Sequence, residues 1–180
     1  MNPPRQKNII ASRSAKARKT KGLTQMTPNQ EPSPYMDNLT IFHAKDEFEG
    51  TCYVEIMPSK FVGKHFNKGS IYINDEAFGL FQWAFQRYIP RYDPWGEFNV
   101  TSLKMSKTAS DLEAFEKMIL EGKLMEDFKT FCRMATPWLE IQLERTLQRQ
   151  RAELVASTHK IVQWIREQEK TTSHFAVLGV

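Results

Sequence analysis

The stretch that decides the fold is Ser70-Ile-Tyr-Ile-Asn-Asp-Glu-Ala-Phe-Gly-Leu-Phe-Gln-Trp-Ala-Phe-Gln-Arg-Tyr-Ile89. Its first residues, 70–73, follow a glycine and are β-branched or aromatic, which predicts a strand. Asn74 and Asp75 come next, and either side chain can accept the free amide hydrogens at a helix N-terminus. Over 76–89 large apolar side chains recur every three or four residues and form one face. The stretch therefore predicts a strand that runs directly into an amphipathic helix packed on the sheet.

Other short strands are predicted on both sides of this stretch. The β-branched and aromatic runs over 39–43 and 51–57 are separated by a polar segment that ends at Gly50, so they are predicted to form a hairpin. Residues 98–105 predict one more strand. The apolar segment 175–180 is expected either to dock as a strand or to serve as a tail that binds a partner.

The C-terminal half is predicted to be mostly helical. A cap within 108–111 begins an amphipathic helix that ends near Gly122, and a second helix is expected over 123–135. Residues 138–169 lack Gly and Pro, which predicts one long helix that is able to bend. The fold class is therefore α+β: a small antiparallel sheet packed by an aromatic-rich helix and followed by a helical half with one long helix.

The long helix carries an interrupted heptad pattern. Leu147, Leu154 and Ile161 are seven residues apart, but Gln150 and Ser157 interrupt the seam. We expect this helix to pack on its own domain, with homodimerisation through the seam as the alternative.

Composition bounds the class of protein. The chain has 180 residues, of which 41% are hydrophobic, which suits one domain, and it has no apolar stretch long enough for a membrane span. Its two cysteines, Cys52 and Cys132, exclude a disulfide framework and are expected to be small core residues. A cytoplasmic location is the expectation.

The basic charge is concentrated at the N-terminus. Residues 1–30 carry seven basic side chains and no acid, whereas the rest of the chain has a net charge of −3. With five prolines and few large hydrophobes, residues 1–34 are predicted to be a disordered basic tail, and 35–180 the α+β domain. Three interpretations of this tail remain open: it binds nucleic acid or an anionic membrane surface, it is a transit segment, or it is dispensable and the domain begins at Met36. The residues expected to contact nucleic acid are Arg13, Lys16, Arg18, Lys19 and Lys21.

Motifs of enzymes and metal sites are missing from the sequence. It contains no phosphate-binding loop, no dinucleotide fingerprint, no H-E-x-x-H and no nucleophile elbow. The four histidines are isolated from one another and from cysteine, so no metal and no cofactor are expected. Asp75 and Glu76 are explained by helix capping, and we predict a protein without catalytic residues.

Aromatic residues beside arginines form the candidate binding surface. On a continuous helix Trp83 lies off the main apolar face, and the loop after Pro90 brings Tyr92 and Trp95 together. Trp, Tyr and Arg are the residues that most often anchor protein interfaces. The alternative is that the tryptophans complete the core. The predicted partner-binding residues are Trp83, Arg87, Arg91, Tyr92 and Trp95, with Asp75 and Glu76 as acidic contacts.

Two runs resemble small bacterial immunity-type proteins that accompany polymorphic toxins. They are Ser70-Ile-Tyr-Ile-Asn-Asp-Glu-Ala-Phe-Gly-Leu-Phe81 and Tyr88-Ile-Pro-Arg-Tyr-Asp-Pro-Trp-Gly-Glu-Phe-Asn99. The resemblance implies a non-enzymatic protein that binds and blocks a protein partner, such as a toxin. Stacking of unpaired bases on the same aromatics lacks a clustered basic groove, so the alternative, a nucleic-acid-binding accessory protein, depends on the basic tail.

Overall fold

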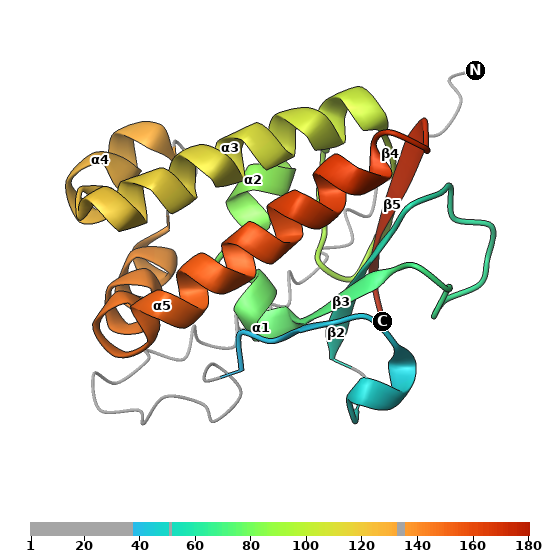
Figure 1. The fold of residues 1–180 in the computed structure, drawn as a ribbon, viewed down its shortest axis with the longest axis horizontal. Helices are drawn as coiled ribbons and strands as arrows, with labels where there is room; N and C mark the ends of the chain where they lie inside the picture. Colours follow the sequence, from blue (N-terminus) through green and yellow to red (C-terminus); the bar gives the residue numbers. More distant parts are fainter. Residues whose placement is uncertain (1–37, 51, 133–135) are drawn as a thin grey trace, which may run out of the picture. The chain divides into compact units, whose positions relative to one another are not determined.

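The computed structural model describes residues 38–50, 52–132 and 136–180. The predicted disordered tail of residues 1–34 lies outside them. The described residues form the predicted α+β fold, with a five-stranded antiparallel sheet and a helical C-terminal half (Figure 1). The strands, in their order across the sheet, are β1 (Ile41–Phe42), β3 (Ile71–Asn74), β2 (Tyr53–Met57), β5 (His174–Gly179) and β4 (Glu97–Thr101).

The predicted hairpin between the first two strands is wrong. β1 pairs with β3, and β2 pairs with β3 on one side and β5 on the other. β2 is buried along its whole length, as expected for an interior strand covered on both faces, whereas β1 has only two residues. The segment between them contains a short 3-10 helix, Lys45–Glu47, and carries the chain across to the interior of the sheet.

The C-terminal segment is a strand and not a free tail. β5 lies between β2 and β4, and its pairing with β4 extends from Leu178 opposite Glu97 to His174 opposite Thr101. The last residue, Val180, also exchanges two backbone hydrogen bonds with Tyr53. The C-terminus is therefore part of the sheet.

The helix predicted over 76–89 is two short helices, α1 (Asp75–Phe78) and α2 (Gln82–Gln86). Asn74 caps α1 as predicted, because its Oδ1 accepts hydrogen bonds from the next two free amides. Between α1 and α2 the Leu80 amide donates to the Ala77 carbonyl and the Phe81 amide to the Phe78 carbonyl, a tighter 3-10 pattern. A Cβ atom on Gly79 would lie 3.0 Å from the ring of Trp138, and glycine permits this close approach.

The boundary between β4 and the next helix lies earlier than predicted. β4 ends at Thr101, and α3 (Ser102–Glu121) begins immediately, so residues 102–105 are helical and not extended. Thr108 does not cap this helix. Its hydroxyl donates to the carbonyl of Lys104 one turn earlier, inside the helix. The predicted end is confirmed, because Gly122 adopts a left-handed φ of 74°.

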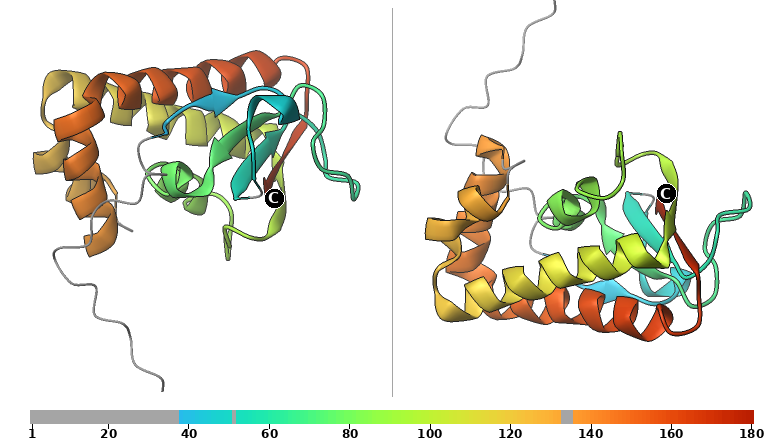
Figure 2. Two further views of the ribbon diagram at one scale, coloured as in Figure 1. Left: turned by 90° about the horizontal axis from the view of Figure 1, so that it is seen from below. Right: turned by 90° about the horizontal axis from the view of Figure 1, so that it is seen from above.

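The remaining helices are α4 (Leu124–Phe131) and α5 (Pro137–Gln168). α5 bends at Gln150, whose φ of −142° and ψ of 39° are not helical. Beyond the bend, α5 runs beside α3 (Figures 1 and 2), and Leu154 and Ile161 of the heptad seam are buried. The seam packs within its own domain, as expected, and those two side chains are not available for homodimerisation.

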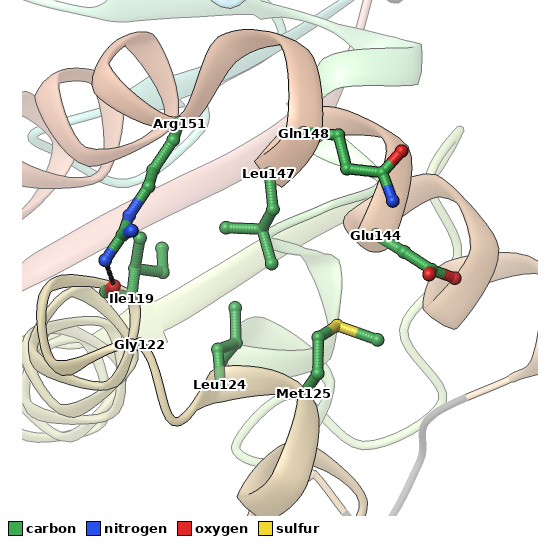
Figure 3. Close-up of a pocket in the computed structure, with 8 residues that line it drawn as sticks. All are labelled: Ile119, Gly122, Leu124, Met125, Glu144, Leu147, Gln148 and Arg151. Atoms are coloured by element: carbon green, nitrogen blue, oxygen red, sulfur yellow. Dashed lines mark hydrogen bonds between the residues drawn. The ribbon is translucent and has the colours of Figure 1, made fainter.

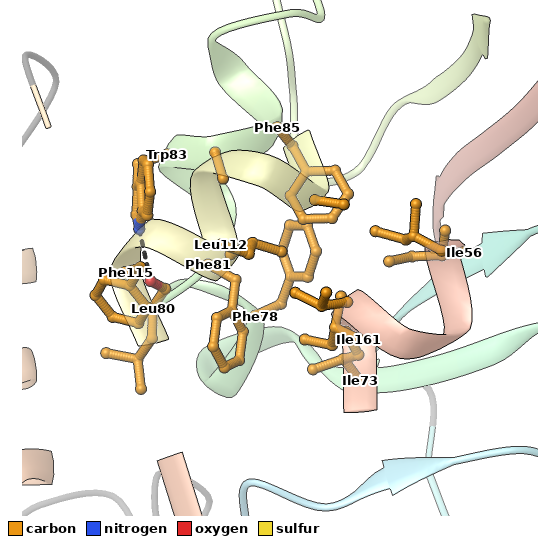
Figure 4. Packing of buried hydrophobic residues seen from close by; sticks show 14 of the residues in the cluster. Ile56, Ile73, Phe78, Leu80, Phe81, Trp83, Phe85, Leu112, Phe115 and Ile161 are labelled. Carbon is orange, nitrogen blue, oxygen red and sulfur yellow. Dashed lines mark hydrogen bonds between the residues drawn. The ribbon is translucent and has the colours of Figure 1, made fainter. Parts of the chain in front are cut away.

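The main core lies between the sheet and the helices. Alternate strand residues such as Ile56 and Ile73 meet Phe78, Phe85 and Ile161 there (Figure 4). This cluster contains most of the large buried side chains of the described residues. Burial of apolar area of this kind contributes most of the stability of a domain.

The opposite face of the sheet is covered by aromatic side chains and by the loop 58–70. Glu55 of β2 is fully buried on this face. Its carboxylate accepts hydrogen bonds from the amides of Phe66 and Asn67, at 2.9 and 3.0 Å, and from the Ser70 hydroxyl, at 2.7 Å. Burial and the nearby Glu55 carboxylate raise the pKa of Tyr72 to about 12. The loop is therefore anchored to the sheet through one carboxylate.

No helix among the described residues is both long enough and apolar enough to cross a bilayer.

Candidate protein-binding surface

One end of the sheet brings together most of the residues predicted to bind a partner. Here Asn74 at the end of β3 pairs with Tyr53 at the start of β2, and Leu178 of β5 pairs with Glu97 at the start of β4. We call the residues exposed at this end, Glu49, Gly50, Cys52, Asp75, Glu76 and Arg91 to Glu97, the sheet-end surface.

Backbone hydrogen bonds connect the parts of the sheet-end surface. The Asp75 amide donates to the Cys52 carbonyl at 3.1 Å, and the Gly179 amide donates to the Gly96 carbonyl at 3.1 Å. Adjacent strands are about 4.8 Å apart, so the three intervals from β3 to β4 separate Asp75 from the Trp95 loop by roughly 14 Å. Both regions fit within the footprint of a single protein partner.

The loop 91–96 holds Trp95 in a fixed position. The Trp95 amide donates to Oδ1 of Asp93 at 3.0 Å, and the Gly96 amide donates to the Asp93 carbonyl at 2.9 Å. A Cβ atom on Gly179 would lie 2.5 Å from the Pro94 carbonyl oxygen and 2.7 Å from the Trp95 Cα atom. Only glycine allows this approach between β5 and the loop, which Figure 2 shows beside the C-terminus.

The two aromatic residues of the loop have different surroundings. The Trp95 residue is 61% exposed. The ring of Tyr92 turns inward and stacks on Phe98, with 5.3 Å between ring centroids, and burial followed by the Asp93 charge raises the pKa of Tyr92. Tyr92 therefore supports the loop, and Trp95 is the side chain presented to solvent. The sequence left open whether this loop is exposed or completes the core, and the structure shows Trp95 and Arg91 exposed.

An acidic pocket lies on the β3 side of the same end of the sheet. It has a volume of about 670 Å³. One carboxylate oxygen of Glu76, Oε2, is buried and has no hydrogen-bond partner within the described ranges. Carboxylates in this arrangement favour a cation from a partner, such as an arginine or lysine side chain. The residues that line the pocket are Glu49, Gly50, Cys52, Tyr53, Asn74, Asp75 and Glu76.

The prediction that Trp83 contributes to an exposed surface is wrong. Trp83 is 2% exposed, its indole nitrogen donates to the Leu80 carbonyl at 3.0 Å, and its ring packs on Phe115 and Phe128. The helical projection placed Trp83 away from the apolar face, but that side of α2 is also covered. Phe115 of α3 and Phe128 of α4 pack against it, so Trp83 belongs to the core, which was the alternative interpretation.

Arg87 connects two helices and is not directed at the sheet-end surface. Its guanidinium lies 2.8 Å from the Asp111 carboxylate of α3, and the Tyr88 hydroxyl donates to the same oxygen at 3.0 Å. The guanidinium also lies over the ring of Phe131, 5.5 Å from its centroid. These contacts account for Arg87 as a residue that holds α2 against α3.

The sequence analysis missed Glu49 and Cys52. Both precede β2, whose position beside β3 was not predicted, and no local motif marks either residue. The expectation of a buried Cys132 is confirmed, but that of a buried Cys52 is wrong, because Cys52 is exposed. It lies at the end of an interior strand, where the pocket opens to solvent.

Because Cys52 is exposed and Cys132 is buried, only one of the two thiols should react in the native protein. In the native protein a small disulfide reagent should modify Cys52 within minutes and leave Cys132 unmodified, so that one thiol is released per chain. Unfolding in guanidinium should raise the count to two. Peptide mapping identifies the modified residue, and rapid modification of Cys132 in the native protein would contradict the packing of α4.

A second pocket, of about 260 Å³, lies between α3, α4 and α5 (Figure 3). Its wall is formed by side chains such as Leu124 and Leu147. Arg151 at its edge donates to the carbonyls of Ile119 and Leu120 at the end of α3, so the guanidinium completes that helix terminus. This pocket offers little convergent chemistry, in contrast to the sheet-end surface.

Searches for similar proteins returned no matching family model, curated protein or solved structure. Among the described residues, no group of three or more His, Cys, Asp or Glu side chains is placed to hold a metal ion. The tail residues expected to contact nucleic acid, Arg13, Lys16, Arg18, Lys19 and Lys21, lie outside the described ranges.

Proposed function

We propose that this protein is a non-catalytic binding module that occludes a protein partner through the sheet-end surface. The observation that carries the proposal is Trp95, a large side chain that is exposed on a loop held in one conformation by β5. A side chain positioned before binding loses less conformational entropy in the complex. Tryptophan also contributes a large contact area and an N–H donor, which is why it is common at the centres of interfaces.

The charge of the surface indicates the kind of partner. Carboxylates of Glu49, Asp75 and Glu76 surround the pocket, and Asp93 and Glu97 flank Trp95. Among the described residues, the cations here are Arg91 and Lys45, whose ammonium group donates to the Gly50 carbonyl at 3.2 Å. An acidic surface associates fastest with a basic one, because long-range attraction steers the encounter. We infer that the partner is a protein with a basic surface and an apolar depression that accepts the Trp95 ring.

More specifically, we propose that the partner is a toxin and that this protein inhibits it in the cytoplasm. This proposal is supported by the resemblance of residues 70–81 and 88–99 to immunity-type proteins. A module that covers a basic surface blocks any reaction that requires a substrate to reach that surface. Neither a cofactor nor a catalytic residue of this chain is needed for such a mechanism.

A photo-crosslinking experiment tests the surface assignment. A benzophenone amino acid placed at position 95 should crosslink to one protein in the native cells, and that protein, purified, should form an equimolar complex with this chain. The matched control has the same group at Leu103, which is 68% exposed and follows the opposite end of β4. Equal crosslinking from both positions, or an equimolar complex labelled only from position 103, would place the interface elsewhere.

A further inference from the structure

The loop that connects β2 to β3 differs from the sheet-end surface in both position and charge. It leaves β2 after Met57 and enters β3 at Ile71, at the other end of these strands from the Tyr53–Asn74 pair. Residues 57–74 contain Lys60, Lys64 and Lys68 but no Asp or Glu. All three lysines are exposed, and Figures 1 and 2 show the loop projecting away from the helices.

The lysines of this loop lack acidic neighbours, in contrast to several lysines of the helices. Lys117, Lys123 and Lys129 each form an ion pair with a glutamate. Within the part of the chain that the structure describes, no carboxylate lies at ion-pair distance from the ammonium groups of Lys60, Lys64 or Lys68. The Glu55 carboxylate under the loop is directed at amides and hydroxyls. The loop therefore presents three lysines without an ion pair among the described residues, with the buried Glu55 carboxylate beneath them and the Glu97 carboxylate 3.8 Å from His65.

The backbone that carries these lysines is held at several points. In addition to the Glu55 contacts, the Phe61 amide donates to Oδ1 of Asn99 on β4 at 2.8 Å, and the Asn67 side chain donates to the Lys64 carbonyl at 2.5 Å. Gly63 and Gly69 adopt left-handed φ values of 83° and 88°, which turn the loop back on itself. A fixed backbone reduces the entropy that binding would otherwise cost.

An aromatic ring lies within this basic surface. Phe66 is 42% exposed and stacks on Tyr72, with 6.0 Å between ring centroids. The ammonium group of Lys45 lies 4.9 Å from the centroid of the Phe66 ring and adds a fourth positive charge. Cations that follow a phosphate backbone, combined with an aromatic ring near them, are the features with which proteins bind single-stranded nucleic acid.

We propose that the loop 58–70 is a binding site for single-stranded nucleic acid, in which Lys60, Lys64 and Lys68 contact phosphates and Phe66 contacts a base. A membrane surface fits less well. The apolar residue most exposed on the loop is Val62, at 85%, whereas Phe61 packs back onto the sheet beside Met57. Stable membrane association requires a larger apolar area than Val62 and the partly exposed Phe66 ring provide. The loop begins and ends at the other end of β2 and β3 from the sheet-end surface, but the two regions adjoin, because His65 lies 3.8 Å from the Glu97 carboxylate and the Lys45 ammonium group donates to the Gly50 carbonyl.

The test compares two triple variants of the full chain by fluorescence anisotropy with a labelled 20-nucleotide oligo(dT) probe. K60Q/K64Q/K68Q removes the loop charges, and K104Q/K107Q/K160Q removes three exposed lysines from α3 and α5. Three phosphate contacts on a single strand contribute about 2 to the slope of log Kobs against log salt. Raising the salt from about 50 to about 200 mM should therefore weaken oligonucleotide binding by the wild-type chain about 20-fold more than binding by the loop variant. The helix variant should retain the wild-type slope.

Further variants distinguish the loop from the basic tail. Phe66→Ala should weaken oligonucleotide binding about tenfold if the ring stacks on a base. The tail variant R13Q/K16Q/R18Q/K19Q/K21Q should lower the affinity for the oligonucleotide. When the loop or helix substitutions are added to the tail variant, the difference between them should remain unchanged. Thermal melting shows that each variant is folded, and Trp95→Ala should not affect oligonucleotide binding.

Three results would overturn the proposal. In the first, the loop and helix variants lose affinity equally, which would indicate a general effect of net charge. In the second, the tail variant abolishes the difference between them. In the third, the chain binds phosphatidylserine vesicles through the loop lysines but does not bind the oligonucleotide.

Discussion

Replacing Trp95 with alanine should weaken the complex with the protein partner by about 30-fold or more, which corresponds to about 2 kcal/mol of binding free energy. The side chain is 61% exposed, so the isolated protein gives up little buried area when it is removed. The melting temperature of the free protein should therefore change by no more than about 2 °C. Calorimetric titration of the purified partner measures the affinity.

Leu103→Ala is the matched control for this variant. It also removes a large exposed apolar side chain, but one located after the opposite end of β4. We expect its affinity to equal that of the wild type. If Trp95→Ala binds as tightly as Leu103→Ala, the partner does not use the Trp95 loop, and the proposed surface must be abandoned.

The acidic pocket should affect mainly the rate of association with the partner. Glu49→Gln combined with Asp75→Asn removes two exposed or half-buried charges and should lower the association rate and its salt dependence more than it raises the dissociation rate. Stopped-flow measurements at two salt concentrations separate these effects. Trp95→Ala tests the contact made by the Trp95 side chain, and the Glu49/Asp75 variant tests electrostatic steering independently of it.

Replacing Glu55 with alanine should destabilise the folded domain by about 2–4 kcal/mol. The variant leaves the Phe66 and Asn67 amides and the Ser70 hydroxyl without their acceptor beneath the loop. Loss of a buried charged acceptor costs about 1–3 kcal/mol for each group left unpaired, and water in a partly exposed loop offsets part of this. Chemical denaturation measures the loss.

The same substitution should release the loop 58–70 to proteolysis. Trypsin cleaves after lysine, and Lys60, Lys64 and Lys68 are already exposed, so cleavage is limited by the rigidity of the backbone. Glu55→Ala should therefore be cut in this loop much faster than the wild type. Glu97→Ala is the control, since that carboxylate is 55% exposed and lies 3.8 Å from a ring nitrogen of His65 without accepting a backbone hydrogen bond from the loop among the described contacts. Equal stability and equal cleavage of the two variants would show that Glu55 does not hold the loop.

Much of the secondary structure followed from local patterns. Asn74 was predicted as a candidate helix cap, Gly122 as a helix end and 138–169 as one long helix, and the structure confirms each within a few residues. These features depend on hydrogen bonds and side-chain spacing within one segment. Periodicity over a long segment without Gly or Pro is a strong signal because many residues contribute to it.

The candidate site was predicted only in part, because its residues belong to different strands. The loop with Trp95 was identified from its composition. Trp83 was assigned to the surface because the residues that cover it, Phe115 and Phe128, are far away in sequence. Cys52 and Glu49 were missed because the pocket forms only where β2 pairs with β3 and β5.

By itself, the sequence determined the α+β class, the positions of most helices and strands and the loop that carries Trp95, because propensity, capping and periodicity act over a few residues. The tertiary structure alone decided the strand order, the exposure of Trp95, the burial of Trp83 and the role of Glu55. Each of these depends on contacts between segments distant in the chain, such as the Glu55 carboxylate with loop amides or Trp83 with Phe115. Such contacts form only when the whole core is assembled, and no local pattern encodes them.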